Sequence, residues 1–122
     1  MASVVQTDGL SKCFGKLRAV NNLKLDVQEG SIYAFLGPNG AGKTTTIKLL
    51  MNIMKPTGGS SSVLGVNSGK LDEETWRQIG YVSENQKLPD WMSVGGFLEY
   101  CKSMYPRWDD DFCAKLLRQF DL

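Results

Sequence analysis

The order of hydrophobic and polar residues predicts strands in the first third of the chain. Residues 4–10 form a short candidate strand, and residues 23–27 alternate apolar with polar side chains, as a strand with one buried face does. After the turn signal at residues 28–30, residues 31–36 are apolar on both faces, which predicts a central, buried strand. A hairpin is therefore expected to lead into this central strand. Residues 11–16 read as the loop between its two strands.

Helical spacing of apolar residues predicts helices over residues 46–54, 94–105 and from 110 onward. Ser93 is the predicted N-cap of the second helix and Asp109 that of the third. The acidic residues 109–111 could instead bind a metal, but carboxylates in a first helical turn are far more often caps. Shorter elements are predicted between the first two helices: a strand at 61–64, a helical turn at 71–76 and a strand at 79–82. The last helix has no stop signal, so we expect an arbitrary end at 122.

A glycine-rich turn joins the predicted central strand to the first helix: Gly37-Pro38-Asn39-Gly40-Ala41-Gly42-Lys43-Thr44-Thr45. Its spacing is the full phosphate-loop pattern, in which glycines let backbone N–H groups converge on phosphate oxygens at a helix N-terminus. Lys43 would add a charge for the β- and γ-phosphates, and the Thr44 hydroxyl could be a ligand of Mg²⁺. A plain glycine-rich turn is the simpler alternative, which the strand and helix on either side disfavour.

Composition limits the chain to one small domain of 122 residues with a net charge of +1. Such a charge gives no field for nucleic acid or an anionic membrane, so we expect no nucleic-acid partner. The chain has 3 cysteines without metal-ligand spacing and no histidine, which is typical of reduced intracellular thiols. It has neither an apolar stretch of membrane-spanning length nor a signal-peptide pattern, and we expect a cytoplasmic location.

Two exposed-looking aromatic positions keep two interpretations each. Phe14 lies in a polar loop, where it could stack on a nucleobase or simply pack on the hairpin. Trp91, with Met92 beside it, could be a partner surface, although loop aromatics more often cover their own core.

The glycine-rich turn resembles the Walker A loop of ATP-binding cassette (ABC) ATPases, the motor subunits of ABC transporters. Its flanks agree: residues 10–15 are similar to the family's A-loop, 26–30 to the turn before the central strand, and 55–59 to the segment after the first helix. Residues 79–84 look like the approach to the family's Q-loop. The resemblance covers essentially the whole chain.

This resemblance implies ATP and Mg²⁺ as ligands and gives the candidate residues their roles. Phe14 would stack on adenine, Thr44 would coordinate Mg²⁺, and Glu84 would help to hold the metal, with Gln86 as the alternative. The phosphate-binding residues would be Gly37, Asn39, Gly40, Ala41, Gly42, Lys43, Thr44 and Thr45. It also implies two protein partners: a second ATPase subunit, and a transmembrane permease that would contact the segment from Glu84 to Met92.

The chain departs from the family pattern in two respects. Glu84 stands where the family usually has Gln, which keeps an oxygen donor but adds negative charge near the γ-phosphate. The signature motif, the Walker B Asp with the catalytic Glu, the D-loop and the switch His have no counterpart here. Residues 93–97 only superficially resemble the signature, because they lack its Gln and lie in an apolar helical stripe.

The sequence therefore predicts a truncated α/β P-loop NTPase of the ABC ATPase type. Its parts would be a β-subdomain with the central strand (1–36), the phosphate loop and first helix (37–54), β-segments with the Q-loop-like region (55–92), and the start of a helical subdomain (93–122). We expect MgATP binding with little or no hydrolysis. The alternative is a structural fragment that associates with itself through exposed apolar surface. A GTPase or kinase fits poorly, because no guanine-reading motif or phosphoryl-acceptor site is visible.

Overall fold

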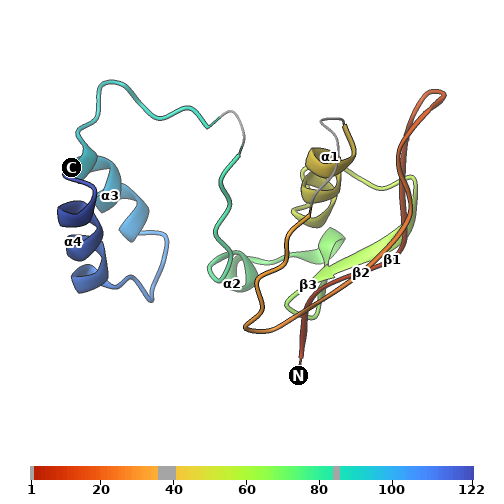
Figure 1. Cartoon of the computed structure of the whole chain (residues 1–122), viewed down its shortest axis with the longest axis horizontal. Helices are drawn as coiled ribbons and strands as arrows, with labels where there is room; N and C mark the ends of the chain where they lie inside the picture. Colours follow the sequence, from red (N-terminus) through yellow and green to blue (C-terminus); the bar gives the residue numbers. More distant parts are fainter. Residues whose placement is uncertain (1, 36–40, 84–85) are drawn as a thin grey trace. The chain divides into compact units, whose positions relative to one another are not determined.

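The computed structural model describes residues 2–35, 41–83 and 86–122. They form two compact units, Met1–Thr75 and Trp76–Leu122, which are described separately. The first unit carries the sheet and helix α1, and the second carries helices α3 and α4 (Figure 1). No helix in the described parts of the chain is both long and apolar enough to cross a membrane.

The first unit is built on a four-stranded antiparallel sheet. Strands β1 (Ser3–Phe14), β2 (Leu17–Gln28), β3 (Gly58–Val63) and β4 (Val66–Asn67) lie in the order β2-β1-β3-β4. Strand β1 is central, since Thr7 pairs with Leu25 on one side and Ser61 on the other. The sheet thus joins the N-terminal hairpin to the segment that follows α1.

The predicted hairpin strands are confirmed but longer than expected. Residues 11–14, assigned to a loop from their polarity, belong to β1, and only residues 15 and 16 form the turn. The ladder continues because Cys13 pairs with Arg18 and Phe14 with Leu17. Gly15 adopts a φ of 59°, which suits the tight reversal.

Helix α1 (Ala41–Leu50) covers the sheet and completes the core of the first unit (Figure 1). The core consists of Leu10 from β1, Val20 from β2 and Leu49 from α1, with Leu23 and Met54 packed against it. The helix begins at Ala41, earlier than the predicted range 46–54, and it also ends earlier, because the chain turns at Asn52, whose φ is 57°. A small core thus fixes α1 on the hairpin.

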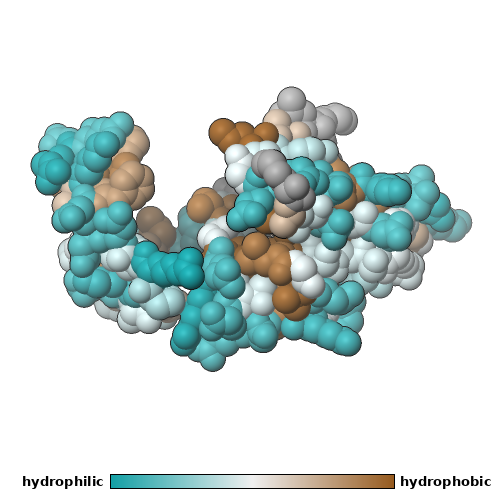
Figure 2. Space-filling model, turned by 90° about the horizontal axis from the view of Figure 1, so that it is seen from below, coloured by the Kyte–Doolittle hydropathy of each residue, from teal (hydrophilic) through white to brown (hydrophobic). Residues whose placement is uncertain are grey.

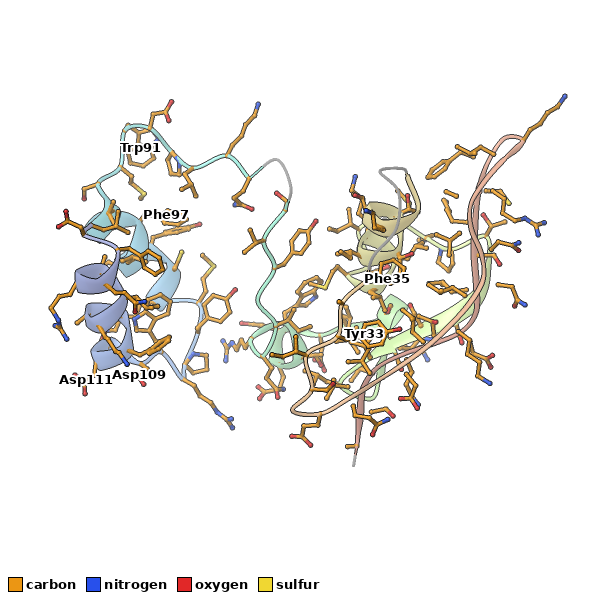
Figure 3. All side chains as sticks on the ribbon, viewed as in Figure 1. Tyr33, Phe35, Trp91, Phe97, Asp109 and Asp111 are labelled. Carbon is orange, nitrogen blue, oxygen red and sulfur yellow. The ribbon has the colours of Figure 1, made fainter. Side chains whose placement is uncertain are left out.

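The predicted central strand over residues 31–36 is wrong for the part that the structure describes. Residues 31–35 form no strand, and Ile32 and Tyr33 are 103% and 52% exposed. Tyr33 and Phe35 lie on the extended segment that follows β2 (Figure 3). Only β1–β4 form the described sheet, so this apolar run has no neighbouring strand with which to form a ladder.

The same correction applies to the predicted strand at residues 79–82, which is not a strand and leaves Val82 84% exposed. Hydrophobic residues accordingly reach the surface in the space-filling view (Figure 2). In both segments the apolar pattern is typical of a strand, but it does not show whether a neighbouring strand is available for pairing.

Two short helical turns follow β4: η1 (Ser68–Lys70) and α2 (Glu73–Trp76). The buried Ser61 hydroxyl of β3 donates to the Ser68 hydroxyl at 2.7 Å, which holds η1 on the sheet. Helix α2 confirms the predicted helical turn at 71–76, and its first turn is closed by the Asp72 carboxylate, which accepts from Thr75 N at 2.8 Å.

The second unit contains α3 (Val94–Lys102) and α4 (Asp110–Gln119). Both predicted caps are confirmed: Ser93 Oγ accepts from Gly96 N at 3.0 Å, and Asp109 Oδ1 accepts from Phe112 N at 2.9 Å. Asp109 and Asp111 lie at the end where α4 begins (Figure 3). Helix α3 stops three residues before the predicted end at 105, and neither helix contains a buried residue.

Candidate functional site

The candidate phosphate loop is described from its helical end. Gly37, Asn39 and Gly40 lie outside the described residues, and Ala41 is the first residue of α1. The other candidates, Gly42, Lys43, Thr44 and Thr45, all lie in the first turns of α1. They are therefore at the N-terminal end of a helix, whose first backbone N–H groups, up to that of Lys43, have no partner within the helix.

The side chains of this first turn differ in accessibility. Thr44 is exposed and Lys43 is partly exposed, whereas Thr45 is only 5% exposed. The Thr44 hydroxyl is thus available to a ligand in solution. The Thr45 side chain belongs to the packing of α1.

Gly42 has a second role that its place in the motif does not show. A Cβ at this position would lie 2.9 Å from the carbonyl oxygen of Ala19 in β2, which is closer than real Cβ atoms approach backbone. The hydroxyl of Thr46, which is 2% exposed, donates to the Gly42 carbonyl at 2.7 Å. Gly42 therefore lets the start of α1 approach the hairpin closely, and the Thr46 hydroxyl bonds within the same turn of the helix. Thr46 lies outside the phosphate-loop pattern, and its helical position four residues after Gly42 is the sequence signal for this hydrogen bond.

Phe14 ends β1 and remains 43% exposed. The Nζ of Lys12 lies over its ring, 5.5 Å from the ring centroid, which is within the range of a cation–π interaction. Phe14 is absent from the buried core of Leu10, Val20 and Leu49. An accessible ring in this position is compatible with stacking on a ligand.

The metal-binding candidates lie in different parts of the chain. Glu84 lies outside the described residues, and Gln86 belongs to the second unit, whereas Thr44 belongs to the first. The amide oxygen of Gln86 accepts hydrogen bonds from Ser83 N at 3.3 Å and Ser83 Oγ at 3.1 Å. Thr44 is thus the described candidate whose hydroxyl is an accessible hard oxygen, which suits Mg²⁺.

The Q-loop-like segment ends in an accessible aromatic residue. Trp91 precedes α3 and is 82% exposed, whereas Met92 is partly buried (Figure 3). The expectation that a loop aromatic covers its own core is wrong for Trp91, because most of its indole remains in contact with solvent. Trp91 is available to a partner surface.

Comparison with known proteins agrees with this arrangement of elements. A protein-family model described as "ABC transporter" matches residues 20–122. The bacitracin transport ATP-binding protein BcrA of Bacillus licheniformis is 43% identical over 84 residues, covering 69% of this chain and 28% of BcrA. The uncharacterized ABC transporter ATP-binding protein sll0415 of Synechocystis sp. is 33% identical over 128 residues, covering 99% of this chain and 36% of that protein. The chain therefore spans about a third of the length of these relatives.

Solved structures extend the match to the fold. The structure described as the ATP-binding subunit of an ABC transporter superposes with a TM-score of 0.83 at 27% identity, covering 98% of this chain and 51% of that one. A nucleotide-free ATP-binding cassette superposes with a TM-score of 0.60 at 20% identity, covering 96% of this chain and 53% of that one, and supports the fold alone. With a family match over residues 20–122 and the P-loop NTPase fold, the chain belongs to the ABC transporter ATP-binding family.

Proposed function

We propose that this chain is the MgATP-binding portion of an ABC transporter ATPase. The observation that carries the proposal is the placement of Gly42, Lys43 and Thr44 in the first turn of a helix seated on the β-hairpin, in a chain of this family. In the complete dimeric protein, ATP hydrolysis would be coupled to transport across a membrane. The chain would then be cytoplasmic and peripheral to that membrane.

In this proposal the two ends of the nucleotide are bound by different elements of the first unit. Phe14, at the end of β1, stacks on adenine. The N-terminal turn of α1 binds the phosphates through backbone N–H groups and the Lys43 ammonium. The full phosphate-binding set is Gly37, Asn39, Gly40, Ala41, Gly42, Lys43, Thr44 and Thr45.

Mg²⁺ would be held by the Thr44 hydroxyl and by Glu84 or Gln86, and when bound it would neutralise negative charge on the phosphates. The exposed Thr44 hydroxyl fits this role, because Mg²⁺ prefers hard oxygen ligands. The chain contains no residues that resemble the Walker B carboxylates or the switch His. It therefore binds and positions the nucleotide without a group to activate water, and we expect negligible turnover.

A calorimetric titration of the 122-residue chain with MgATP tests the proposal. We expect saturable binding that the substitution Lys43→Ala weakens at least tenfold, since a charge-assisted contact to phosphate is lost. Lys48→Ala, in the last turn of the same helix, is the matched control and should bind as the unchanged chain does. Absence of binding, or equal losses in both variants, would refute the proposal. ATPase activity that disappears in Lys43→Ala would contradict the expected lack of turnover.

Exposed apolar side chains favour a second candidate, a structural chain that associates with itself without binding nucleotide. Ile32, Val82 and Trp91 are 103%, 84% and 82% exposed, more than isolated surface residues usually require. Size measurement by light scattering during the titration separates the two. Defined monomers that bind MgATP support the first candidate, and concentration-dependent oligomers that bind none support the second.

The protein partners in the first candidate are a second ATPase subunit and a transmembrane permease. We place the permease contact on the segment from Glu84 to Met92, and the 82% exposure of Trp91 supports an open contact surface there. A permease expressed with the complete ATPase should be retained by the unchanged subunit and lost with Trp91→Ala. If the Trp91→Ala subunit retained the permease as well as the unchanged subunit does, the permease contact would not lie at Trp91.

A further inference from the structure

Lys12 makes two contacts that connect the end of β1 to the segment after α1. Its Nζ donates a hydrogen bond to the carbonyl oxygen of Lys55 at 2.7 Å. The same ammonium lies over the Phe14 ring, 5.5 Å from the centroid. One cation is thus shared between a backbone acceptor 43 residues away and the aromatic ring of its own strand.

Thr57 strengthens the same connection through one backbone and one side-chain hydrogen bond. Its N–H donates to the carbonyl oxygen of Ser11 at 2.9 Å, and its hydroxyl oxygen accepts from Cys13 N at 3.0 Å. The end of β1 is therefore held on both sides of Lys12. In Figure 1 the segment between α1 and β3 crosses to the β1–β2 hairpin, where these contacts form.

We propose that Lys12 is a positioning residue that fixes the Phe14 ring so that its opposite face receives the nucleobase of ATP. This inference rests on the proposed function and deepens it. An aromatic ring has two faces, and an ammonium over one of them is attracted by the ring quadrupole. Phe14 is 43% exposed, so part of its surface remains available for stacking.

The hydrogen bond from Lys12 to Lys55 also connects the Phe14 ring to the segment after α1. Lys55 and Thr57 belong to the segment that continues from α1, the helix that carries Lys43 and Thr44. Lys12 thus connects the Phe14 ring to the polypeptide segment that continues from the phosphate-binding helix. In this proposal the base and phosphate subsites are connected through five residues outside the phosphate-loop motif: Ser11, Lys12, Cys13, Lys55 and Thr57.

The test compares MgATP with magnesium tripolyphosphate, which has the phosphates but no base. Lys12→Met keeps the aliphatic stem of the side chain and removes its charge, whereas Lys12→Arg keeps a positive charge at this position. We expect Lys12→Met to weaken MgATP binding about threefold, as for an exposed cation–π pair. Lys12→Arg should bind nearly as the unchanged chain, and tripolyphosphate affinity should be equal in all three proteins.

A double substitution shows whether Lys12 acts through Phe14. We expect Phe14→Ala to weaken MgATP binding about tenfold, as for loss of one base–aromatic stack, and Lys12→Met/Phe14→Ala to be no weaker than Phe14→Ala alone. Thr57→Val, which removes the acceptor for Cys13 N at an exposed position, should resemble Lys12→Met. Urea unfolding of each variant shows whether a loss of affinity accompanies a loss of stability. We expect Lys12→Arg to be as stable as the unchanged chain.

Four results would overturn the positioning role. A loss of tripolyphosphate affinity in Lys12→Met would make Lys12 a phosphate contact, and a further loss in the double variant would make it independent of Phe14. Unchanged MgATP affinity in Lys12→Met, with binding still dependent on Lys43, would refute this inference and leave the proposed function standing. If the unchanged chain bound neither ligand, both would be refuted.

Discussion

Gly59 in β3 packs directly against the backbone of Gly9 in β1. A Cβ at Gly59 would lie 2.1 Å from the Gly9 carbonyl oxygen and 2.3 Å from its carbonyl carbon. Gly59 also has a φ of 75°, and Gly9 a φ of 61°, so both residues adopt the left-handed conformation that glycine permits. The close pairing of β1 with β3 therefore depends on the absence of a side chain at residue 59.

We predict that Gly59→Ala destabilises the chain by more than about 2 kcal/mol, because the left-handed backbone and the overlap with Gly9 both oppose a Cβ. Gly30→Ala is the matched control: its φ is 76°, but a Cβ there would meet nothing within 4 Å. That variant should lose only about 1 kcal/mol, the conformational cost alone. Urea unfolding followed by circular dichroism gives both values, and equal losses would show that the contact with Gly9 is unimportant.

The second prediction concerns the core beneath the candidate site. Leu49 is 1% exposed and packs with Leu10 and Val20, so Leu49→Ala should destabilise the chain by about 2–4 kcal/mol and loosen α1 on the hairpin. Ile47→Ala on the same helix is the control, because Ile47 is 41% exposed and should lose under about 1 kcal/mol. Chemical unfolding measures both, and a similar loss in the two variants would contradict the assignment of the core.

The features that the sequence predicted correctly depend on neighbours a few residues away. Ser93 and Asp109 were recognisable as caps because each bonds an N–H three residues on. The phosphate-loop residues Gly42 to Thr44 were recognisable from spacing and from the helix that follows. Their family was recognisable for the same reason.

The features that the sequence missed depend on distant partners. Residues 31–35 have the composition of a buried strand, but composition does not state whether a neighbouring strand is available, and Ile32 is 103% exposed. The bond from Lys12 to Lys55 spans 43 residues, and the packing of Gly42 on Ala19 spans two elements. Hydrophobic periodicity contains no information on such contacts between segments far apart in the sequence.

The third prediction follows from the cap of α2. The Asp72 carboxylate accepts from the Thr75 hydroxyl at 2.6 Å and from Thr75 N at 2.8 Å, and these bonds lower the pKa of Asp72 below its ordinary value of 3.8. A lowered pKa means that the cap stabilises the fold above the unfolded-state pKa, and that this contribution is lost as pH falls through the folded-state pKa. A carboxyl ¹³C NMR titration should place the Asp72 midpoint below 3.8.

Thr75→Val removes the hydroxyl, the largest cause of the shift, and should move the Asp72 pKa back toward 3.8. Thr75→Ser keeps a hydroxyl and should retain most of the shift. An Asp72 midpoint that is the same in the two variants would assign the lowered pKa to the backbone bond from Thr75 N alone.

The last prediction concerns the ion pair that joins α3 to α4. Lys102 Nζ lies 2.9 Å from Asp110 Oδ1 and 3.0 Å from Oδ2. Hydrogen bonding to Asp110 is the main cause that raises the pKa of Lys102 above 10.5, with smaller contributions from the charges of Asp110, Glu99 and Cys113. Because the pKa is raised, the pair stabilises the second unit below the unfolded-state pKa, and this stabilisation is lost as pH rises through the folded-state pKa.

Asp110→Asn should therefore lower the pKa of Lys102 toward 10.5 in a side-chain ¹³C NMR titration and destabilise the chain slightly at neutral pH. Asp110 also lies in the first turn of α4, where a carboxylate favours the helix dipole, so Asp111→Asn in the same turn is the control for that effect. The side chains of the pair are 40% and 68% exposed, so the difference between the two variants should shrink as salt screens it. Equal melting temperatures for the two variants at low salt would show that the ion pair adds nothing beyond the dipole, because Asp110 lies at bonding distance from Lys102 and carries the ion pair that Asp111→Asn leaves in place.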